Sequence, residues 1–135
     1  MADNKACVET VARYIEDVYP RGARLVEVGV GERDETARRL ADAGYDVTAT
    51  DVRDVGDSVG VDFVRDNVRE PDAGVYEGTA LVYSLRPPYE IHADIEEVAR
   101  TVGADLLLAP LGDEGVSFDA RLVSRGGRGF FVNRF

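Results

Sequence analysis

The amino-acid sequence predicts an α/β protein with a doubly wound, mostly parallel sheet and a C-terminal antiparallel hairpin. Short, largely apolar segments alternate with segments of helical period, which is typical of parallel strands covered on both faces. The first apolar segment ends in Gly29 and Gly31 and passes directly into a polar, helix-forming stretch, as a strand does when it turns over a ligand. Near the C-terminus the period changes to the alternation of an antiparallel pair.

The predicted elements follow one another in a regular order. Residues 5–19 form an amphipathic helix, and glycines end both later helices, at Gly44 and Gly103. Residues 52–60 are expected to be a loop or a broken helical turn, and 71–74 are predicted to be a turn. The strands are predicted at 25–30, 45–50, 61–64, 79–85 and 104–111, and the later helices at 32–43 and 91–102.

A hairpin closes the chain. Residues 118–124 and 129–134 alternate in polarity on either side of Arg125-Gly126-Gly127-Arg128, which is typical of a tight antiparallel turn. The outer strand leaves an edge with which a second copy of the chain can pair, so a homodimer is an expectation. The 135 residues contain no internal repeat or linker. We expect a single domain over 1–135, with the N-terminal helix 5–19, a ligand-binding core 24–111 and the closing hairpin 118–134.

The charge of the chain limits its classes of partner. There are 26 acidic and 16 basic residues, a formal net charge of −10, and Lys5 is the only lysine. Such acid-rich, lysine-poor surfaces resemble those of halophilic archaeal proteins, in which salt screens the self-repulsion. The net basic footprint that non-specific binding to nucleic acid or to an anionic membrane requires is absent from this composition.

Cysteine content and hydropathy limit the chain further. Cys7 is the single cysteine, which excludes an internal disulfide and a multi-cysteine metal site, so no bound metal is expected. The sequence has no secretory signal and no apolar run long enough to cross a bilayer. We therefore expect a cytoplasmic protein without a membrane partner.

Residues that carry chemistry gather where the parallel strands end. Asp51 follows the second strand, about 20 residues after Gly31, where a carboxylate can accept both hydrogen bonds of a ribose diol. Asp66 and Asn67 follow the third strand, and such a pair suits the amino edge of an adenine. Because the carboxyl ends of parallel strands meet at the switch point, we expect a small nucleoside ligand there. The predicted binding residues are Glu27, Gly29, Gly31, Asp51, Val52, Asp66 and Asn67.

Two family resemblances rest on these residues. Glu27-Val28-Gly29-Val30-Gly31 resembles motif I of the class I S-adenosylmethionine-dependent methyltransferases, and Asp51 and Asp66 match the acids that follow their second and third strands. Nearly the whole chain resembles a small archaeal group, uncharacterised protein family 0146, which shares the glycine loop and segment 84–89 and carries no activity to transfer. The resemblance implies a Rossmann-like, methyltransferase-like fold with S-adenosylmethionine as cofactor. It places the methionine end over the glycines, the ribose on Asp51, and the adenine at Asp66 and Asn67.

The segment after strand four departs from the methyltransferase pattern. Amino-group methyltransferases of this type carry Asp, Asn or Ser before Pro-Pro-Tyr, where this sequence has Arg86. Arginine has only donors and does not deprotonate, so Arg86 suits an anionic substrate, or an ion pair with Glu27 or Asp51, better than an amine. Arg86 and Tyr89 are the candidate catalytic residues, and the Tyr89 ring is suited to flank a flat substrate. His92 is expected to be a polar first-turn residue, with an acid or base role as the alternative.

Three functions stay open on the sequence alone. The first is an S-adenosylmethionine-dependent methyltransferase of unidentified substrate, and the second is a non-catalytic module or partner subunit that binds this cofactor or S-adenosylhomocysteine. The third is an NAD(P)-binding domain, which is disfavoured because Asp34 replaces the last glycine of the dinucleotide motif and acids crowd the pyrophosphate position. No lid is inserted, so only the N-terminal helix and residues 112–117 are expected to cover the site.

Overall fold

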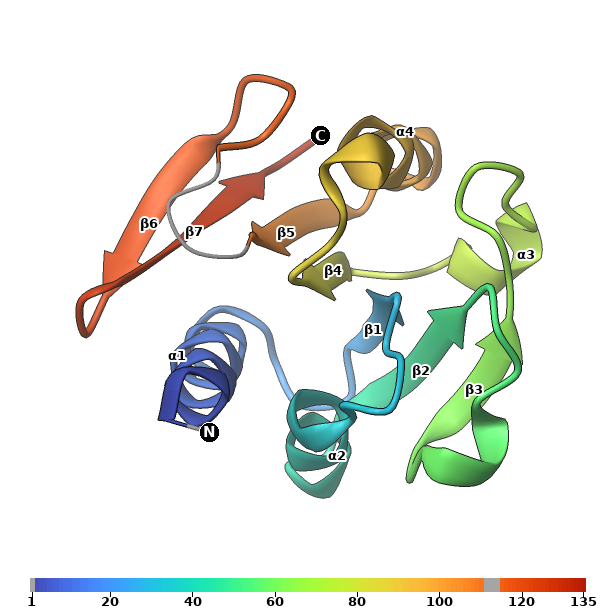
Figure 1. Ribbon diagram of the computed structural model, residues 1–135, viewed down its shortest axis with the longest axis horizontal. Helices are drawn as coiled ribbons and strands as arrows, with labels where there is room; N and C mark the ends of the chain where they lie inside the picture. Colours follow the sequence, from blue (N-terminus) through green and yellow to red (C-terminus); the bar gives the residue numbers. More distant parts are fainter. Residues whose placement is uncertain (1, 111–114) are drawn as a thin grey trace.

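A seven-stranded sheet organises the part of the chain that the computed structural model describes, residues 2–110 and 115–135 (Figure 1). Its strands are β1 (Arg24–Val28), β2 (Asp46–Asp51), β3 (Asp62–Arg65), β4 (Leu81–Leu85), β5 (Asp105–Ala109), β6 (Arg121–Arg125) and β7 (Arg128–Asn133). They are ordered β3-β2-β1-β4-β5-β7-β6. Strands β1 to β5 are parallel, and β7 runs antiparallel to both β5 and β6. The predicted fold class, doubly wound with a C-terminal antiparallel hairpin, is confirmed.

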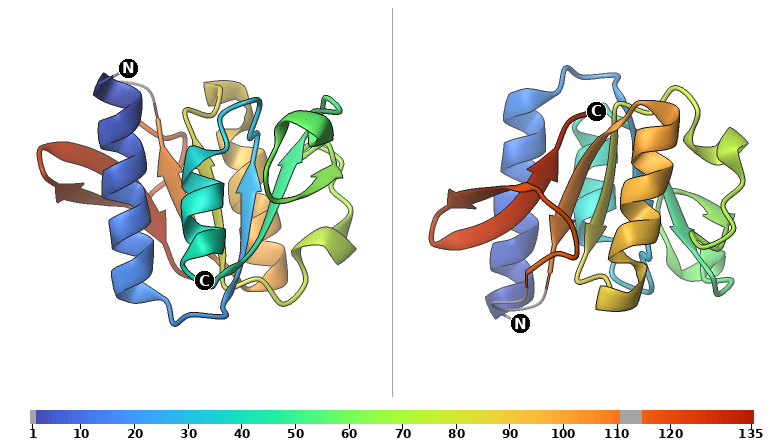
Figure 2. Two further views of the ribbon diagram at one scale, coloured as in Figure 1. Left: turned by 90° about the horizontal axis from the view of Figure 1, so that it is seen from below. Right: turned by 90° about the horizontal axis from the view of Figure 1, so that it is seen from above.

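Helices cover both faces of this sheet (Figure 2). Helices α1 (Ala2–Val18) and α2 (Glu35–Asp42) pack together on one face, and α4 (His92–Val102) covers β4 and β5 on the other. The short α3 (Ala73–Tyr76) packs beside α4. Two 3₁₀ turns, η1 (Gly56–Ser58) and η2 (Tyr89–Ile91), lie in the connections after β2 and β4. Within the described ranges, no helix is both long and apolar enough to cross a membrane.

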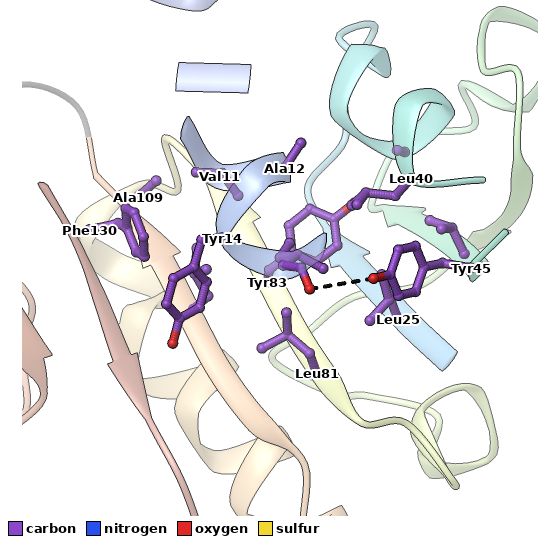
Figure 3. Close-up of a cluster of buried hydrophobic side chains, with 14 of the residues drawn as sticks. Val11, Ala12, Tyr14, Leu25, Leu40, Tyr45, Leu81, Tyr83, Ala109 and Phe130 are labelled. Atoms are coloured by element: carbon purple, nitrogen blue, oxygen red, sulfur yellow. Dashed lines mark hydrogen bonds between the residues drawn. The ribbon is translucent and has the colours of Figure 1, made fainter. Parts of the chain in front are cut away.

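Alternate residues of the central strands point into two cores on opposite faces of the sheet. Leu25 packs with the α1 and α2 residues, and Val26, the next residue of β1, packs with those of α4. Figure 3 shows the first core, in which Tyr14 of α1 meets Phe130 of β7 edge to face with 5.0 Å between ring centroids. Because burial of such apolar surface is the main favourable term in folding, α1 is an integral layer of the fold.

The switch point of the sheet lies at β1, which pairs with β2 on one side and β4 on the other. The backbone N–H of Gly29 donates to the Thr50 carbonyl at 2.9 Å, and the Ser84 hydroxyl donates to the Val28 carbonyl at 2.7 Å. The carboxyl ends of β1, β2 and β4 are therefore tied together, at the place where doubly wound sheets bind their ligands.

Helix α2 begins later than its sequence pattern predicts. The pattern starts the helix at residue 32, whereas the structure starts it at Glu35. Gly31 has a left-handed φ of 56°, and the Arg33 N–H donates to the Val30 carbonyl at 3.1 Å, so a tight turn takes up the residues between. The polar residues that resemble a first helical turn are instead a loop over the end of β1.

The short helix α3 is not predicted by the sequence, which indicates only a turn over 71–74. Asp72 caps this helix by accepting a hydrogen bond from the Gly74 N–H at 3.0 Å. The helix is four residues long, and a single turn is too short to show a helical period. The prediction for this stretch was therefore incomplete.

The hairpin is confirmed, with a later start than predicted. Strand β6 begins at Arg121 rather than at residue 118. Before it, the Asn133 side-chain amide donates to the Asp119 carbonyl at 3.0 Å, so a side-chain hydrogen bond joins the two segments there. The turn residues between β6 and β7 both have left-handed φ, 58° and 79°, as a two-residue type I′ turn requires. The end of strand five predicted at Leu111 and the residues 112–114 expected to help cover the site lie outside the described residues.

Candidate functional site

The turn after β1 is held in place by the end of β2. Gly29 and Gly31 have left-handed φ values of 74° and 56°, a conformation that residues with a Cβ rarely adopt. The N–H groups of Gly29 and Val30 both donate to the Thr50 carbonyl, at 2.9 and 3.0 Å. Val30 is buried with Ala49 beneath the turn. The glycine turn is therefore fixed at the sheet edge, and its backbone is open above it.

Asp51 is the last residue of β2 and is 9% exposed. One carboxylate oxygen accepts the Gly31 N–H at 2.9 Å, and the other accepts the Arg53 N–H at 3.0 Å. A carboxylate has about four acceptor positions, so both oxygens can still accept from a ligand. Asp51 thus links the two strand ends, a role that the sequence pattern does not predict, and presents an aligned carboxylate beside the glycine turn.

Asp66 and Asn67 follow β3, as predicted, but their acceptors face their own loop. Asp66 accepts the Asp72 N–H at 3.0 Å and the Tyr76 hydroxyl at 3.3 Å. The Asn67 side-chain oxygen accepts the Arg69 N–H at 3.0 Å. Both residues line the cavity described next, and their present bonds shape the loop from β3 to α3. An adenine contact by either side chain stays a prediction.

A cavity of about 620 Å³ opens over the ends of β1, β2 and β3. This volume lies within the roughly 300–1,000 Å³ typical of small-molecule sites. Val52, a predicted contact residue, is 55% exposed and forms part of an apolar wall with Pro88 and Ile91. The remaining lining residues are Val28, Gly29, Gly31, Thr50, Asp51, Arg53, Asp66, Asn67, Val68 and Arg69.

A second cavity, of about 340 Å³, lies over the ends of β1 and β4. It shares Gly29, Gly31 and Arg53 with the first, so the two adjoin at the glycine turn. Val8 contributes to its wall, which agrees with the expectation that the N-terminal helix covers the site. Its charged lining residues are Glu27, Glu32, Arg33, Glu35, Arg53 and Arg86.

Glu27 lies at the base of the second cavity and is only 2% exposed. Burial, with the negative charges of Asp34 and Glu35, raises the pKa of Glu27 to about 8, against the opposing effect of Tyr83. Within the described part of the chain, its Oε1 atom has no hydrogen-bond partner. Because a buried acceptor without a partner is costly, Glu27 is suited to receive a cationic or hydrogen-bonding ligand group.

Arg86 is placed in the second cavity by an unusual backbone conformation. Its φ is 54°, the single left-handed value at a described residue other than glycine, and its N–H donates to the Ala109 carbonyl at 2.7 Å. Neither of the ion pairs considered for it, with Glu27 or with Asp51, is formed, and its guanidinium has no ion pair with any described residue. Such strain is retained mainly at functional positions.

The other two candidates near strand four lie apart from both cavities. Tyr89 is 52% exposed, and its ring lies 5.2 Å from the His92 ring, but neither residue is among the lining residues of these two cavities. His92 is fully buried, and its Nε2 lies 3.1 Å from the Pro87 carbonyl. His92 is the first residue of α4, in the first turn as predicted, and its burial does not bring it to either cavity.

Comparison with known proteins identifies the relatives of the chain. The model of an uncharacterised protein family, UPF0146, matches residues 8–134. The chain belongs to this family. A UPF0146 protein of Archaeoglobus fulgidus is 44% identical over 124 residues, 92% of each chain. Another, from Halobacterium salinarum, is 45% identical over 94 residues, 70% of this chain and 73% of the relative. The family predicted from the sequence is confirmed.

A solved structure extends the comparison to the fold. Magnesium protoporphyrin IX methyltransferase (ChlM) from Synechocystis PCC 6803, with bound S-adenosylmethionine, matches with a TM-score of 0.64. The match covers 94% of this chain and 76% of that chain at 16% sequence identity, a level that shows a shared fold alone. The UPF0146 chain therefore has a Rossmann-like, methyltransferase-like fold.

The roles of Val8 and Asp34 near the site are not predicted from the sequence of this UPF0146 protein. Val8 occupies an ordinary apolar position of an amphipathic helix, and nothing in the pattern separates it from a core residue. Asp34 stands at the third-glycine position and is buried, where it accepts the Gly60 N–H at 2.6 Å and pairs with Arg38 at 3.2 Å. Asp34 thus anchors α2 to the loop before β3.

No group of three His, Cys, Asp or Glu side chains in the described ranges is arranged to hold a metal ion.

Proposed function

We propose that this protein binds S-adenosylmethionine, or its demethylated product S-adenosylhomocysteine, in the groove formed by the two adjoining cavities. The observation that carries the proposal is the Asp51 carboxylate, which the Gly31 N–H holds at the junction of the cavities. In this arrangement the ribose diol lies on Asp51, the adenine lies in the larger cavity toward Asn67, and the methionine tail crosses the glycine turn. The fold shared with a methyltransferase that was solved with this cofactor supports the same ligand.

The smaller cavity carries charges of both signs, as the zwitterionic methionine tail does. Glu32 and Glu35 line it, and their carboxylates attract the ammonium and sulfonium groups of the cofactor, while the buried Glu27, largely neutral at pH 7 because its pKa is raised to about 8, can hydrogen-bond to the tail. Arg33 and Arg53 line the same cavity and suit the single carboxylate of the tail. The pyrophosphate of a dinucleotide would meet the carboxylates of Glu32 and Glu35 beside these arginines. The buried Asp34, at the third-glycine position of the dinucleotide motif, is the feature that distinguishes the proposal from an NAD(P)-binding domain.

A calorimetric titration against four nucleoside compounds tests this proposal. We expect S-adenosylmethionine and S-adenosylhomocysteine to bind with micromolar dissociation constants, because the groove encloses a nucleoside with a charged tail. NAD and NADP should release no measurable heat at the same concentrations. Tighter binding of either dinucleotide would contradict the proposal.

A non-catalytic binding module is the second candidate, and the surroundings of Arg86 favour it over a methyltransferase that acts on an amine. Arg86 replaces the acceptor residue of amine methyltransferases, and the neighbouring Ser84 hydroxyl is buried and donates to the Val28 carbonyl. Neither group can remove a proton from a nucleophile. Incubation with methyl-labelled cofactor and a cell extract distinguishes the two candidates: transfer of label indicates an enzyme, and binding without transfer indicates a sensor or partner subunit.

A further inference from the structure

We propose that Arg86 forms an anion subsite, which binds the carboxylate or phosphate of a second small molecule beside the cofactor. The inference rests on the proposed function, since it places this second ligand next to the methionine tail. It adds the chemical class of the second molecule: a small oxyanion, which the site receives together with the cofactor.

The backbone at Arg86 holds the side chain over the cavity at an energetic cost. A left-handed φ of 54° is unfavourable for any residue with a Cβ, and glycine adopts it freely. Every other left-handed position in the described ranges is a glycine. An arginine at such a position is explained by a role in the cavity, which Arg86 lines with Glu27 and Leu85.

The cavity holds more cationic groups than the cofactor requires. Arg33, Arg53 and Arg86 all line it, whereas the methionine tail has one carboxylate, for which one guanidinium fork suffices. Arg53 lies 3.7 Å from Asp51, and both Arg33 and Arg53 come from loops on the nucleoside side of β1. Arg86 follows β4, on the opposite side of β1, and has no ion pair with a described residue. No residue in the described ranges therefore supplies its counter-ion, and we assign that role to the second ligand.

An oxyanion also fits the absence of a proton acceptor near Arg86. A carboxylate is already ionised at neutral pH, so its oxygen can attack the sulfonium methyl group without a base. In that transfer an oxygen–carbon bond forms as the sulfur–carbon bond breaks. The electron pair of the broken bond stays on sulfur, the two opposite charges are neutralised, and no proton moves. Arg86 can hold and orient such an acceptor through its paired N–H donors.

Anion titrations of the wild-type protein and of Arg86→Gln test the subsite. Each protein, saturated with S-adenosylhomocysteine, is titrated with acetate and separately with inorganic phosphate at constant ionic strength, and the backbone amides are followed by NMR. We expect a saturable shift at Leu85 and Arg86 in the wild type and its loss in Arg86→Gln. The exposed Arg121 lies in the hairpin, so Arg121→Gln is the matched control and should titrate like the wild type.

Arg86 could bind either a second anion or the carboxylate of the cofactor tail. The affinities of the wild type and of Arg86→Gln for S-adenosylhomocysteine and for methylthioadenosine, which lacks the amino-acid tail, distinguish these two roles. We expect Arg86→Gln to change the affinities for both compounds by the same factor, because the subsite lies beside the tail and does not bind it. A larger loss for S-adenosylhomocysteine alone would mean that Arg86 binds the cofactor carboxylate, and this would overturn the subsite. Equal anion titrations of Arg86→Gln and the wild type, or no titration in either, would also overturn it. Failure of the wild type to bind S-adenosylhomocysteine would count against the proposed function instead, and anion titrations without cofactor would still test Arg86.

A glycine variant distinguishes the effect of the Arg86 guanidinium from the effect of the strained backbone at this position. Arg86→Gly relieves the left-handed conformation, so it should unfold at a higher temperature than Arg86→Gln. Both variants should lose the anion titration. Retention of the titration by Arg86→Gly would show that the backbone, and not the guanidinium, binds the anion, and would contradict the proposal.

Discussion

Replacing Asp51 by alanine is expected to remove detectable binding of S-adenosylhomocysteine while the protein stays folded. Hydrogen bonds from a ribose diol to a carboxylate are worth about 1.5–3 kcal/mol each, so two of them account for a loss of about 100-fold or more. The variant also leaves the Gly31 and Arg53 N–H groups without their acceptor. The glycine turn should loosen, at a cost of about 1–3 kcal/mol of stability. Calorimetry measures the binding, and circular dichroism measures the thermal unfolding.

The exposed Asp57 provides a control for the Asp51 experiment. It lies in η1, in the same connection after β2, and its side chain makes no hydrogen bond or ion pair with the described residues. Asp57→Ala removes the same charge and should bind like the wild type. If Asp51→Ala also binds like the wild type, Asp51 does not hold the ribose and the proposed ligand orientation is wrong.

The stability of the protein should fall as pH rises toward about 8, because of Glu27. Its pKa is raised from 4.5 to about 8 in the folded protein, so between these values the folded state binds a proton that the unfolded state has lost. The stabilising effect of this proton is complete below about 4.5 and is lost as pH rises through about 8. For a fully buried carboxyl group the total effect is several kcal/mol.

Comparison of the wild type with Glu27→Gln isolates this titration. The glutamine variant keeps the shape of a neutral Glu27 and has no group to ionise. The two proteins should therefore be similar in stability near pH 4.5, and the variant should become progressively the more stable as pH rises to about 8. Glu32→Gln, at an exposed position of the same cavity, removes a carboxyl group outside the core and is the matched control. Denaturant unfolding at a series of pH values measures the difference. A difference between Glu27→Gln and the wild type that does not change with pH would show that Glu27 is not held protonated.

The fold was largely predictable, because each parallel strand is a short apolar run and each run ends at the same edge of the sheet. The end of α4 followed from local chemistry, since Gly103 adopts the left-handed φ of 72° that closes a helix. The start of α2 did not follow, because loop residues over a strand end and first-turn helix residues have similar polarity. The helix α3 was not predicted, because four residues are too few to show a helical period of apolar residues.

Part of the candidate site could be predicted from the spacing of residues in the sequence, and part depends on packing between distant segments. Gly29, Gly31 and Asp51 lie together because all three follow strand ends, and sequence spacing locates strand ends. The acceptors of Asp66 turn toward Tyr76, a contact made by a helix that the pattern does not show. The left-handed conformation of Arg86 and the burial that raises the Glu27 pKa arise from neighbours distant in sequence. They could be learned only from the fold.

Chemical-shift mapping with S-adenosylhomocysteine tests most directly whether the groove over the glycine turn is the binding site. Saturable shifts are expected at the amides of Gly29, Gly31 and Asn67, since these line the two cavities. The hairpin-turn glycines Gly126 and Gly127 should keep their positions. Shifts confined to the hairpin, where Arg121 and the residues 132–134 line a separate cavity of about 450 Å³, would contradict the proposed site.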